Sequence, residues 1–247
     1  MARFTMVARR TLTKPELLPS AVAELVREQV VAGTLAPGQR LVEASLADEM
    51  DVSRGTVRDA LKELEDEGLL ENIPRRGTYV VDLGPADVRE VYDLRAAIEM
   101  RAVRLVLERS PRGTTQVQLR QIIERIERAV AAGDGRRAQE LDMAFHGELY
   151  RLSGSRRLEE AFRRLLPVMR LVNRSRHQLF PTLADVPREH MPLVLAIESG
   201  SLAEAEEAID HHLANARDLL IEHFAELRAL QQAQSQAHLT ARGGGAR

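Results

Sequence analysis

The chain has 247 residues, enough for one large or two ordinary domains, and 44% of them are hydrophobic, which suffices for a packed core. It has no cysteine, which excludes disulfides, thiolate metal sites and cysteine nucleophiles, and at a net charge of -2 any affinity for nucleic acid must come from local patches. No apolar run approaches the roughly 20 residues of a membrane span, and the N-terminus lacks the apolar segment of a secretory signal. We therefore expect a cytoplasmic protein without membrane contact.

Composition shifts along the chain predict two domains between two less structured ends. Residues 1–18 are interpreted as a flexible basic arm, and residues 231–247, which end in a run of glycines, as a disordered tail. Residues 19–83 mix helical and β-prone segments, whereas residues 84–230 have helical patterns throughout. The fold class we expect is mainly α, with a small β-hairpin in the first domain and an all-α bundle as the second.

The first domain predicts three helices in succession. A periodic segment from Ser20 to Gly33 is followed by a short strand at residues 39–42 and a second helix at residues 43–49. Ser53 is a good N-cap for the third helix, and Gly68 stands where a glycine would end it. The last two helices and their turn have the order of a helix-turn-helix motif.

The third helix has an apolar side and a cationic side. Val57, Ala60, Leu61 and Leu64 recur at helical spacing on one arc, and Arg54, Arg58 and Lys62 form a stripe beside it. A groove-binding helix needs both faces, although a solvated surface helix has the same pattern.

A turn-rich tip follows this helix. Residues 69–73 and 78–82 are β-prone and flank Pro74, Arg75, Arg76 and Gly77, which predicts a hairpin with two arginines at its tip. Arginines on such a wing suit the minor groove of DNA, whereas a plain hairpin without a DNA contact is the alternative.

Three segments, LAPGQRL (35–41), LADEMDVSRGTVRDALKELEDEGLL (46–70) and PRRGTYV (74–80), resemble the winged helix-turn-helix of the GntR family of bacterial transcriptional regulators. The resemblance implies that phosphates and base edges are contacted by Ser53, Arg54, Thr56 and Arg58, and that Arg76 and Gly77 lie at the wing tip. The chain departs from many members at Gly55 and Thr56, where those have Thr-Pro.

The sequence pattern of the second domain predicts about six helices. They are separated by residues 110–115, 133–135, 153–155, 181–187 and 199–201. Pro167 lies inside the fourth of them and should kink or divide it. The last helix starts with a capping-box pattern at Ser201 and is expected to end at about Leu230.

Polar residues on the buried arcs of these helices indicate a metal site. Asp142 and His146 lie one turn apart on the third helix, His190 on the fifth and His212 on the sixth. A single inward histidine is usually a hydrogen-bonded core residue, but one aspartate and three histidines from three helices can bind one cation. His223 lies about three turns beyond His212 and is interpreted as a packing or interface residue.

Two further sets of polar residues face inward. Arg95 and Glu99 lie on the core arc of the first helix of this domain, and Asn173 and Arg176 on that of the fourth. They could form structural contacts such as a salt bridge between helices. Alternatively, Arg95 binds the carboxylate of an effector, with Asn173 and Arg176 assisting from across the bundle.

Residues 86–228 resemble the FCD ligand-binding domain of the FadR subfamily, on the pattern Asp142-x-x-x-His146, Glu189-His190 and His212-Leu213. We interpret the whole chain as a homodimeric regulator, acting as a repressor, that binds a pseudo-palindromic double-stranded DNA operator and releases it in response to a small carboxylate near a divalent metal. Zinc is the metal we expect, with nickel, manganese or iron as alternatives. The alternative functions are a metal-dependent hydrolase or isomerase with a DNA-binding appendage, and an architectural DNA binder with a structural metal.

Overall fold

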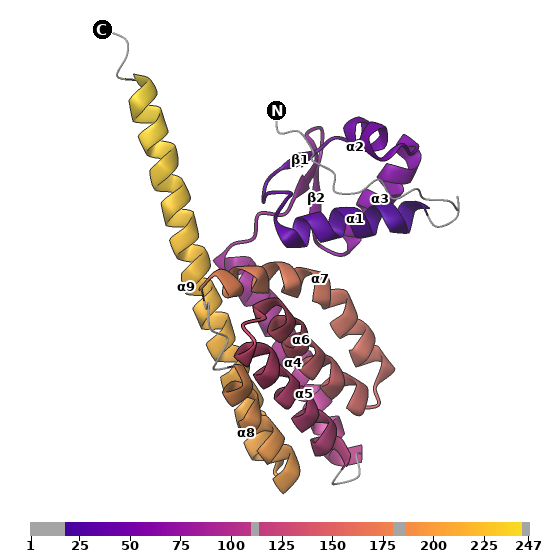
Figure 1. Cartoon of the computed structure of the whole chain (residues 1–247), viewed down its shortest axis with the longest axis vertical. Coiled ribbons are helices and arrows are strands. Elements are labelled where there is room, and N and C mark those ends of the chain that lie inside the picture. The colour runs from indigo at the N-terminus through magenta and orange to yellow at the C-terminus, as the bar shows by residue number, and fades with distance from the viewer. Residues whose placement is uncertain (1–17, 110–113, 180–185, 244–247) are drawn as a thin grey trace. The chain divides into compact units, whose positions relative to one another are not determined.

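The computed structural model describes residues 18–109, 114–179 and 186–243, and the chain divides into two compact units after Asp82 (Figure 1). The described part of the first unit contains α1 (Leu18–Ala32), β1 (Arg40–Leu41), α2 (Glu43–Met50), α3 (Arg54–Asp66), β2 (Leu70–Ile73) and β3 (Gly77–Val80). The arm predicted at residues 1–18 lies, apart from Leu18, outside the described residues.

Both ends of α3 form as the sequence predicts. Ser53 Oγ accepts a hydrogen bond from the backbone N–H of Thr56 at 3.0 Å, which satisfies one of the free donors of the first turn. At the other end Gly68 adopts a φ of 72°, and the N–H of Leu69 donates to the carbonyl of Leu64 at 3.0 Å. This is a Schellman ending, and it turns the chain from α3 directly into β2.

The strands form an antiparallel sheet in the order β1-β3-β2. In this register Leu70 pairs with Val80 and Leu41 with Thr78, so Leu41, Leu70 and Val80 face the core together. The predicted hairpin is confirmed, with its second strand at 77–80 rather than 78–82.

The packing of α1 against α3 sets the position of the predicted DNA-binding helix. Val22, Val26 and Val30 of α1 are fully buried, as are Val57 and Leu64 of α3. At the edge of this contact Arg27 donates to both oxygens of Glu67, at 2.7 and 2.6 Å, and to Glu63 at 3.2 Å. The two helices are thus joined by an apolar seam and by a partly buried ion-pair network.

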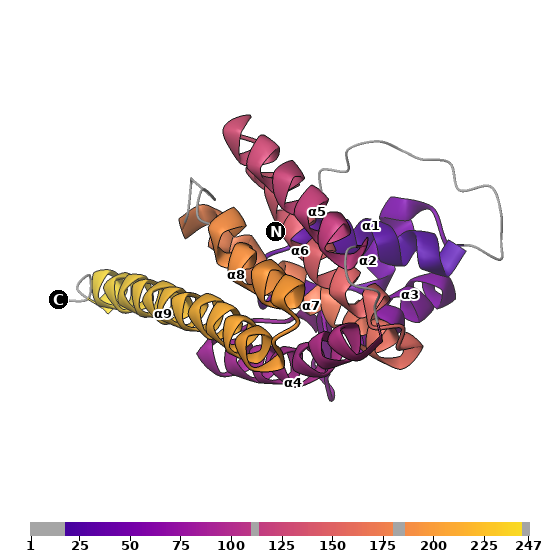
Figure 2. The ribbon, with the colours of Figure 1, turned by 90° about the horizontal axis from the view of Figure 1, so that it is seen from below.

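The second unit is built from helices: α4 (Pro85–Arg109), α5 (Thr114–Ala131), α6 (Gly135–Leu152), α7 (Arg156–Leu179), α8 (Val186–Ser199) and α9 (Leu202–Gly243). Their ends agree closely with the predicted linkers. Seen from below, α8 lies beside α9 and α5 beside α6, and these pairs also pack in the structure (Figure 2). None of the helices within the described ranges is long and apolar enough to span a membrane.

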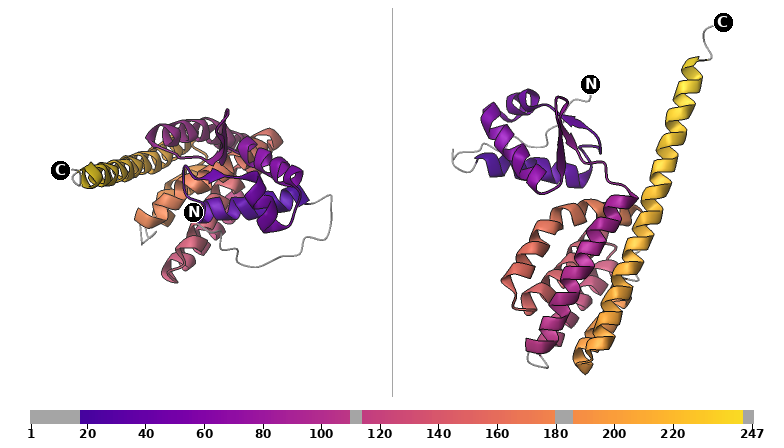
Figure 3. Two further views of the ribbon diagram at one scale, coloured as in Figure 1. Left: turned by 90° about the horizontal axis from the view of Figure 1, so that it is seen from above. Right: turned by 180° about the vertical axis from the view of Figure 1, so that it is seen from behind.

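The helices α4 and α9 run side by side through this unit and form its most extensive contact (Figure 3). Their inner faces share one apolar core with α5, α6, α7 and α8, in which Phe145, Leu149 and Ile209 are fully buried. This core surrounds the polar residues that the sequence places on inward arcs.

Of two predicted helix features, one agrees with the structure and one does not. Pro167 lies inside α7, which runs without a break from Arg156 to Leu179, and the ribbon changes direction along its length (Figure 1), so of the two predicted outcomes the helix is bent and not divided. The last helix does not end at about Leu230, and the predicted tail continues α9 to Gly243. The reason is local: residues 231–242 are rich in alanine and glutamine and contain neither proline nor glycine.

Candidate metal centre and nucleic-acid interface

The outer face of α3 carries the predicted cationic stripe. Arg54, Arg58 and Lys62 are all exposed, and Ser53 and Thr56 lie at the start of the helix, with their hydroxyls 2.8 Å apart. The Arg58 guanidinium is held by Glu43 of α2, through contacts of 3.2 Å from Nε and 2.8 Å from Nη2 to the two carboxylate oxygens. This pairing raises the pKa of Arg58 through its hydrogen bond with Glu43 and keeps the cation in place. The sequence did not indicate a role for Glu43.

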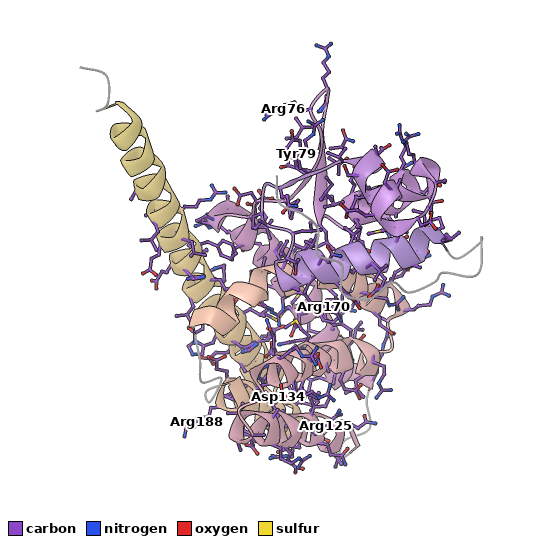
Figure 4. The ribbon with its side chains drawn as sticks, turned by 45° about the horizontal axis from the view of Figure 1, so that its top comes forward. Arg76, Tyr79, Arg125, Asp134, Arg170 and Arg188 are labelled. Carbon is purple, nitrogen blue, oxygen red and sulfur yellow. The ribbon has the colours of Figure 1, made fainter. Side chains whose placement is uncertain are left out.

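The wing tip is a tight turn that presents two arginines. The N–H of Arg76 donates to the carbonyl of Ile73 at 2.9 Å, and Arg75 within this turn has a φ of 66°, in the left-handed region that residues with a side chain rarely adopt. Arg76 and Tyr79 lie close together on the hairpin, with Arg76 Cζ 5.8 Å from the ring centre (Figure 4). Both arginines are exposed.

Arg40 is a further cation at this wing that the sequence did not single out. It lies on β1 opposite Tyr79, and its Nε would be 3.3 Å from a β-carbon added at Gly77. Gly77 itself has a φ of 105°, so any other residue there would be strained and would also crowd Arg40. The pairing of β1 with β3 therefore places Arg40 beside Gly77 of the wing.

In the second unit, imidazoles from three helices converge. His146 lies on α6, His190 on α8 and His212 on α9, and all three are buried. The Nε2 atom of His146 is 3.2 Å from Nε2 of His190 and 3.2 Å from Nε2 of His212. Asp142, one turn before His146, places Oδ1 3.2 Å from Nε2 of His190. The fold thus brings together the four residues that the sequence predicted as metal ligands.

The spacing and protonation of this cluster fit a divalent cation. Two imidazole nitrogens on one ion, each at a normal zinc distance, lie about 2.9 to 3.4 Å apart, and the observed separations of 3.2 Å agree. Burial lowers the pKa of His146 to about 4, and the charge of Arg95 contributes to the shift. Burial and the neighbouring histidines also hold the pKa of His212 well below its usual value. Both imidazoles are therefore neutral at pH 7, which is the form that binds metals.

Glu99 connects this cluster to Arg95. It is fully buried on α4, hydrogen bonds through Oε1 to Nδ1 of His146 and accepts at 3.2 Å through Oε2 from Nε of Arg95. The salt bridge that was expected between helices is thus formed within α4, four residues apart. The position of Glu99 on the buried arc of its helix follows from the sequence, but its contact with His146 was not predicted.

Arg95 retains donor capacity beyond this pair. Its Nη2 is buried and makes no hydrogen bond within the described residues. Tyr150, one turn beyond His146, is fully buried and stacks on Phe162, with ring centres 4.5 Å apart. Its hydroxyl interacts with Glu99 but lacks a hydrogen-bond partner of normal geometry in the described structure. The only feature of the sequence that points to Tyr150 is its spacing of one helical turn from His146.

The other inward-facing residues that the sequence predicted are Asn173, Arg176 and His223. Asn173 is buried, and its Oδ1 accepts from the Tyr92 hydroxyl at 3.2 Å while its amide donates to the sulfur of Met143 at 3.7 Å. The side chain of Arg176 lies outside the described residues. His223 is buried beside Phe224 on α9 and is not part of the histidine cluster, as the spacing predicted.

The described part of the chain thus combines a winged helix-turn-helix with a separate helical bundle that contains a buried histidine cluster. Residues 18–80 match the model of the bacterial regulatory proteins of the gntR family, and residues 90–215 match that of the FCD domain. The chain belongs to the GntR family of transcriptional regulators, in the subgroup with an FCD domain.

Relatives cover most of the chain. The "Probable D-xylose utilization operon transcriptional repressor" of Paenarthrobacter nicotinovorans is 30% identical, over 82% of this chain and 90% of that protein. The HTH-type transcriptional regulator LutR of Bacillus subtilis is 28% identical, over 78% and 97%. A GntR regulator from Rhodococcus sp. RHA1 has the same fold, with a TM-score of 0.68 at 24% identity over 83% of this chain and 97% of that one. The family consists of transcriptional regulators, which are not enzymes, and this sets aside the hydrolase or isomerase alternative.

Proposed function

We propose that the protein is a homodimeric repressor in the bacterial cytoplasm whose affinity for a pseudo-palindromic operator is controlled by a small carboxylate bound near a divalent metal. One observation carries the proposal: the Nε2 atoms of His146, His190 and His212 converge beside Asp142, and the buried Arg95 lies within electrostatic reach of that aspartate. Three imidazoles and a carboxylate suit zinc, our first choice, and also nickel, manganese or iron.

Arg95 supports the choice of a carboxylate as effector. Its Nε is taken by Glu99, while the buried Nη2 has no hydrogen-bond partner within the described residues. A buried donor without a partner is costly, and a carboxylate is the group that guanidinium binds best. A divalent ion held by the four ligands would supply a Lewis acid for another effector oxygen. Asn173 helps indirectly, since it anchors Tyr92, whose ring centre lies 5.4 Å from the Arg95 guanidinium.

Effector binding in the second unit would change the affinity of the first unit for DNA. In a dimer, two copies of α3 meet two half-sites, with the wing arginines Arg75 and Arg76 near the adjacent minor groove. To lower operator affinity, the effector must bind the arrangement that cannot engage both half-sites more tightly than the one that can. A coupling of about 1 to 3 kcal/mol would be ordinary for such a regulator.

Operator binding with and without candidate ligands tests the proposal. An operator is first selected from a random DNA library with zinc-loaded protein, and its affinity is then measured with acetate, glycolate, lactate and citrate. D-xylose, the sugar in the name of one relative, is the matched ligand without a carboxylate. At least one acid should raise the melting temperature and weaken operator binding. If D-xylose does this and no acid does, the carboxylate part of the proposal is wrong.

A ligand variant tests the metal part. His190→Ala should lose bound zinc and the response to the acid, while ligand-free DNA binding stays within about threefold, because His190 lies in the second unit. His211→Ala is the control, since His211 neighbours His212 but is exposed. Unchanged metal content in the His190 variant would refute the four-ligand site.

The dimer is tested by sedimentation. A monomer, with and without operator, would refute the dimer.

A further inference from the structure

The carboxylate of Glu99 contacts two side chains, those of His146 and Arg95. Its side chain is fully buried, Oε1 contacts Nδ1 of His146, and Oε2 accepts from Nε of Arg95 at 3.2 Å. The opposite nitrogen of His146, Nε2, is the one that meets His190 and His212. Glu99 therefore lies directly behind the histidine whose Nε2 is shared by both other imidazoles.

The charges around Glu99 decide where the proton of His146 resides. Oε2 of Glu99 accepts from the guanidinium of Arg95, which stays positively charged in proteins, so Glu99 is the anionic member of a fully buried ion pair. An ionised carboxylate can only accept hydrogen bonds. The proton between the two side chains therefore belongs to Nδ1 of His146, and in the neutral ring Nε2 is then an unprotonated lone pair.

We propose that Glu99 is a positioning residue of the metal centre, which holds His146 in the tautomer with its proton on Nδ1 and so directs the Nε2 lone pair at the cation. This inference rests on the proposed function, because it needs the cluster to bind a metal. Carboxylates behind metal-ligating histidines fix ring orientation and tautomer, and their loss typically costs 10- to 100-fold in metal affinity.

Substitution by glutamine gives a specific expectation because of Arg95. Guanidinium can only donate, so in Glu99→Gln it takes the amide oxygen, and the amide NH2 must then face His146 Nδ1. That nitrogen has to accept, and the proton moves to Nε2, where it blocks the metal. In the double variant Arg95→Met with Glu99→Gln, the amide can turn its oxygen to His146 and restore the wild-type tautomer.

The tautomer can be read without any metal. In metal-free protein labelled with 15N-histidine, long-range proton-nitrogen spectra at pH 7.5 should show His146 protonated on Nδ1 in the wild type and on Nε2 in Glu99→Gln. The double variant should return to Nδ1. A wild-type His146 protonated on Nε2, or a tautomer that is the same in all three proteins, would overturn the proposal.

Zinc affinity, measured by competition with a chromophoric chelator, is the second readout. Glu99→Gln should bind about 10- to 100-fold more weakly than the wild type, whereas Glu108→Gln, an exposed glutamate on the same helix, should not change. If Glu99→Gln does not fold, Arg95→Met with Glu99→Gln and Arg95→Met with Glu99→Leu replace it, since neither has an unpaired buried charge at these two positions.

These double variants differ in whether residue 99 can accept a hydrogen bond. The glutamine variant should bind zinc at least tenfold more tightly than the leucine variant, because only its amide oxygen can hold the Nδ1 proton. Equal affinities would overturn the role of Glu99. A wild-type protein that binds none of zinc, nickel, manganese and iron would instead refute the proposed function, and the tautomer spectra would still report on Glu99 separately.

Discussion

The guanidinium of Arg58 is positioned by a neighbouring carboxylate and remains open to solvent. Glu43 holds it through contacts of 2.8 and 3.2 Å, yet 67% of the Arg58 side chain remains exposed. Water screens an exposed ion pair, so it adds little to stability, and a phosphate or a guanine edge can displace Glu43 at little cost.

Arg58→Ala should weaken binding to the selected operator by about 1 to 3 kcal/mol and relax base preference at one position in each half-site. The physical reason is the loss of a cation that α3 presents on its exposed face. Fluorescence anisotropy with the operator and with single-base variants measures both effects, and Arg125→Ala, an exposed arginine of the second unit, is the control. An equal loss for all sequences would make Arg58 a phosphate contact instead.

His146 should make the stability of the metal-free protein depend on pH. Its folded-state pKa is lowered to about 4, by burial first and by Arg95 second, from an ordinary value of 6.5. The unfolded chain therefore binds more protons between these values, and stability is lost as pH falls from 6.5 towards 4. Between pH 8 and pH 5.5 this single group should remove about 1 kcal/mol.

Urea unfolding in the presence of a chelator at both pH values measures this loss. His146→Gln should make the dependence shallower and leave the part that His212 contributes, because the pKa of His212 is also lowered, while His211→Gln, which changes an exposed histidine, should keep the wild-type slope. Two variants with the same slope would show that His146 does not carry the effect.

Among the elements, the wing hairpin combines a strained backbone with exposed charge. Arg75 has a φ of 66°, a conformation that costs a residue with a side chain about 1 kcal/mol or more. Glycine would take this conformation without strain. An arginine at this position therefore lowers the stability of the protein, at a tip that we expect to contact DNA.

Arg75→Gly should therefore stabilise the protein slightly, by up to about 1 kcal/mol, while weakening DNA binding. If Arg75 contacts one phosphate, the slope of log affinity against log salt should fall by about 0.9. Arg75→Ala is the matched control, because it loses the same charge but keeps the strain. Equal stability of the two variants would contradict the strain argument, and unchanged salt slopes would remove Arg75 from the interface.

At the scale of the whole molecule, the proposed metal site and the proposed DNA-binding surface lie in different units. All four proposed ligands belong to α6, α8 and α9 of the second unit, whereas α3 and the wing belong to the first, which ends at Asp82. A metal bound only by the folded second unit stabilises that unit by mass action, by about 2.7 kcal/mol at a hundredfold excess over its dissociation constant.

Zinc should accordingly slow amide hydrogen exchange in α6, α8 and α9 and leave α1, α2 and α3 unchanged in the absence of DNA and effector. Mass spectrometry of peptides from the full-length protein measures this directly. His190→Ala should abolish the zinc effect. Slower exchange confined to the first unit would place the metal elsewhere.

Most of the fold was predictable from local patterns. Ser53 and Gly68 marked both ends of α3, and the linkers of the second unit stand at or within a few residues of their predicted positions, because caps, glycines and helical periodicity act over a few residues. The end of α9 was predicted too early, although residues 231–242 contain no proline or glycine that would end the helix before Gly243.

The sequence by itself determined the cationic face of α3 and the inward direction of Asp142, His146, His190 and His212, because each follows from the side-chain periodicity of one helix. Only the tertiary structure decided which side chains meet. The contact of Glu99 with His146 joins α4 to α6, that of Glu43 with Arg58 joins α2 to α3, and β-pairing brings Arg40 to the wing. These contacts depend on how separate elements pack, and no local pattern in the chain encodes that packing.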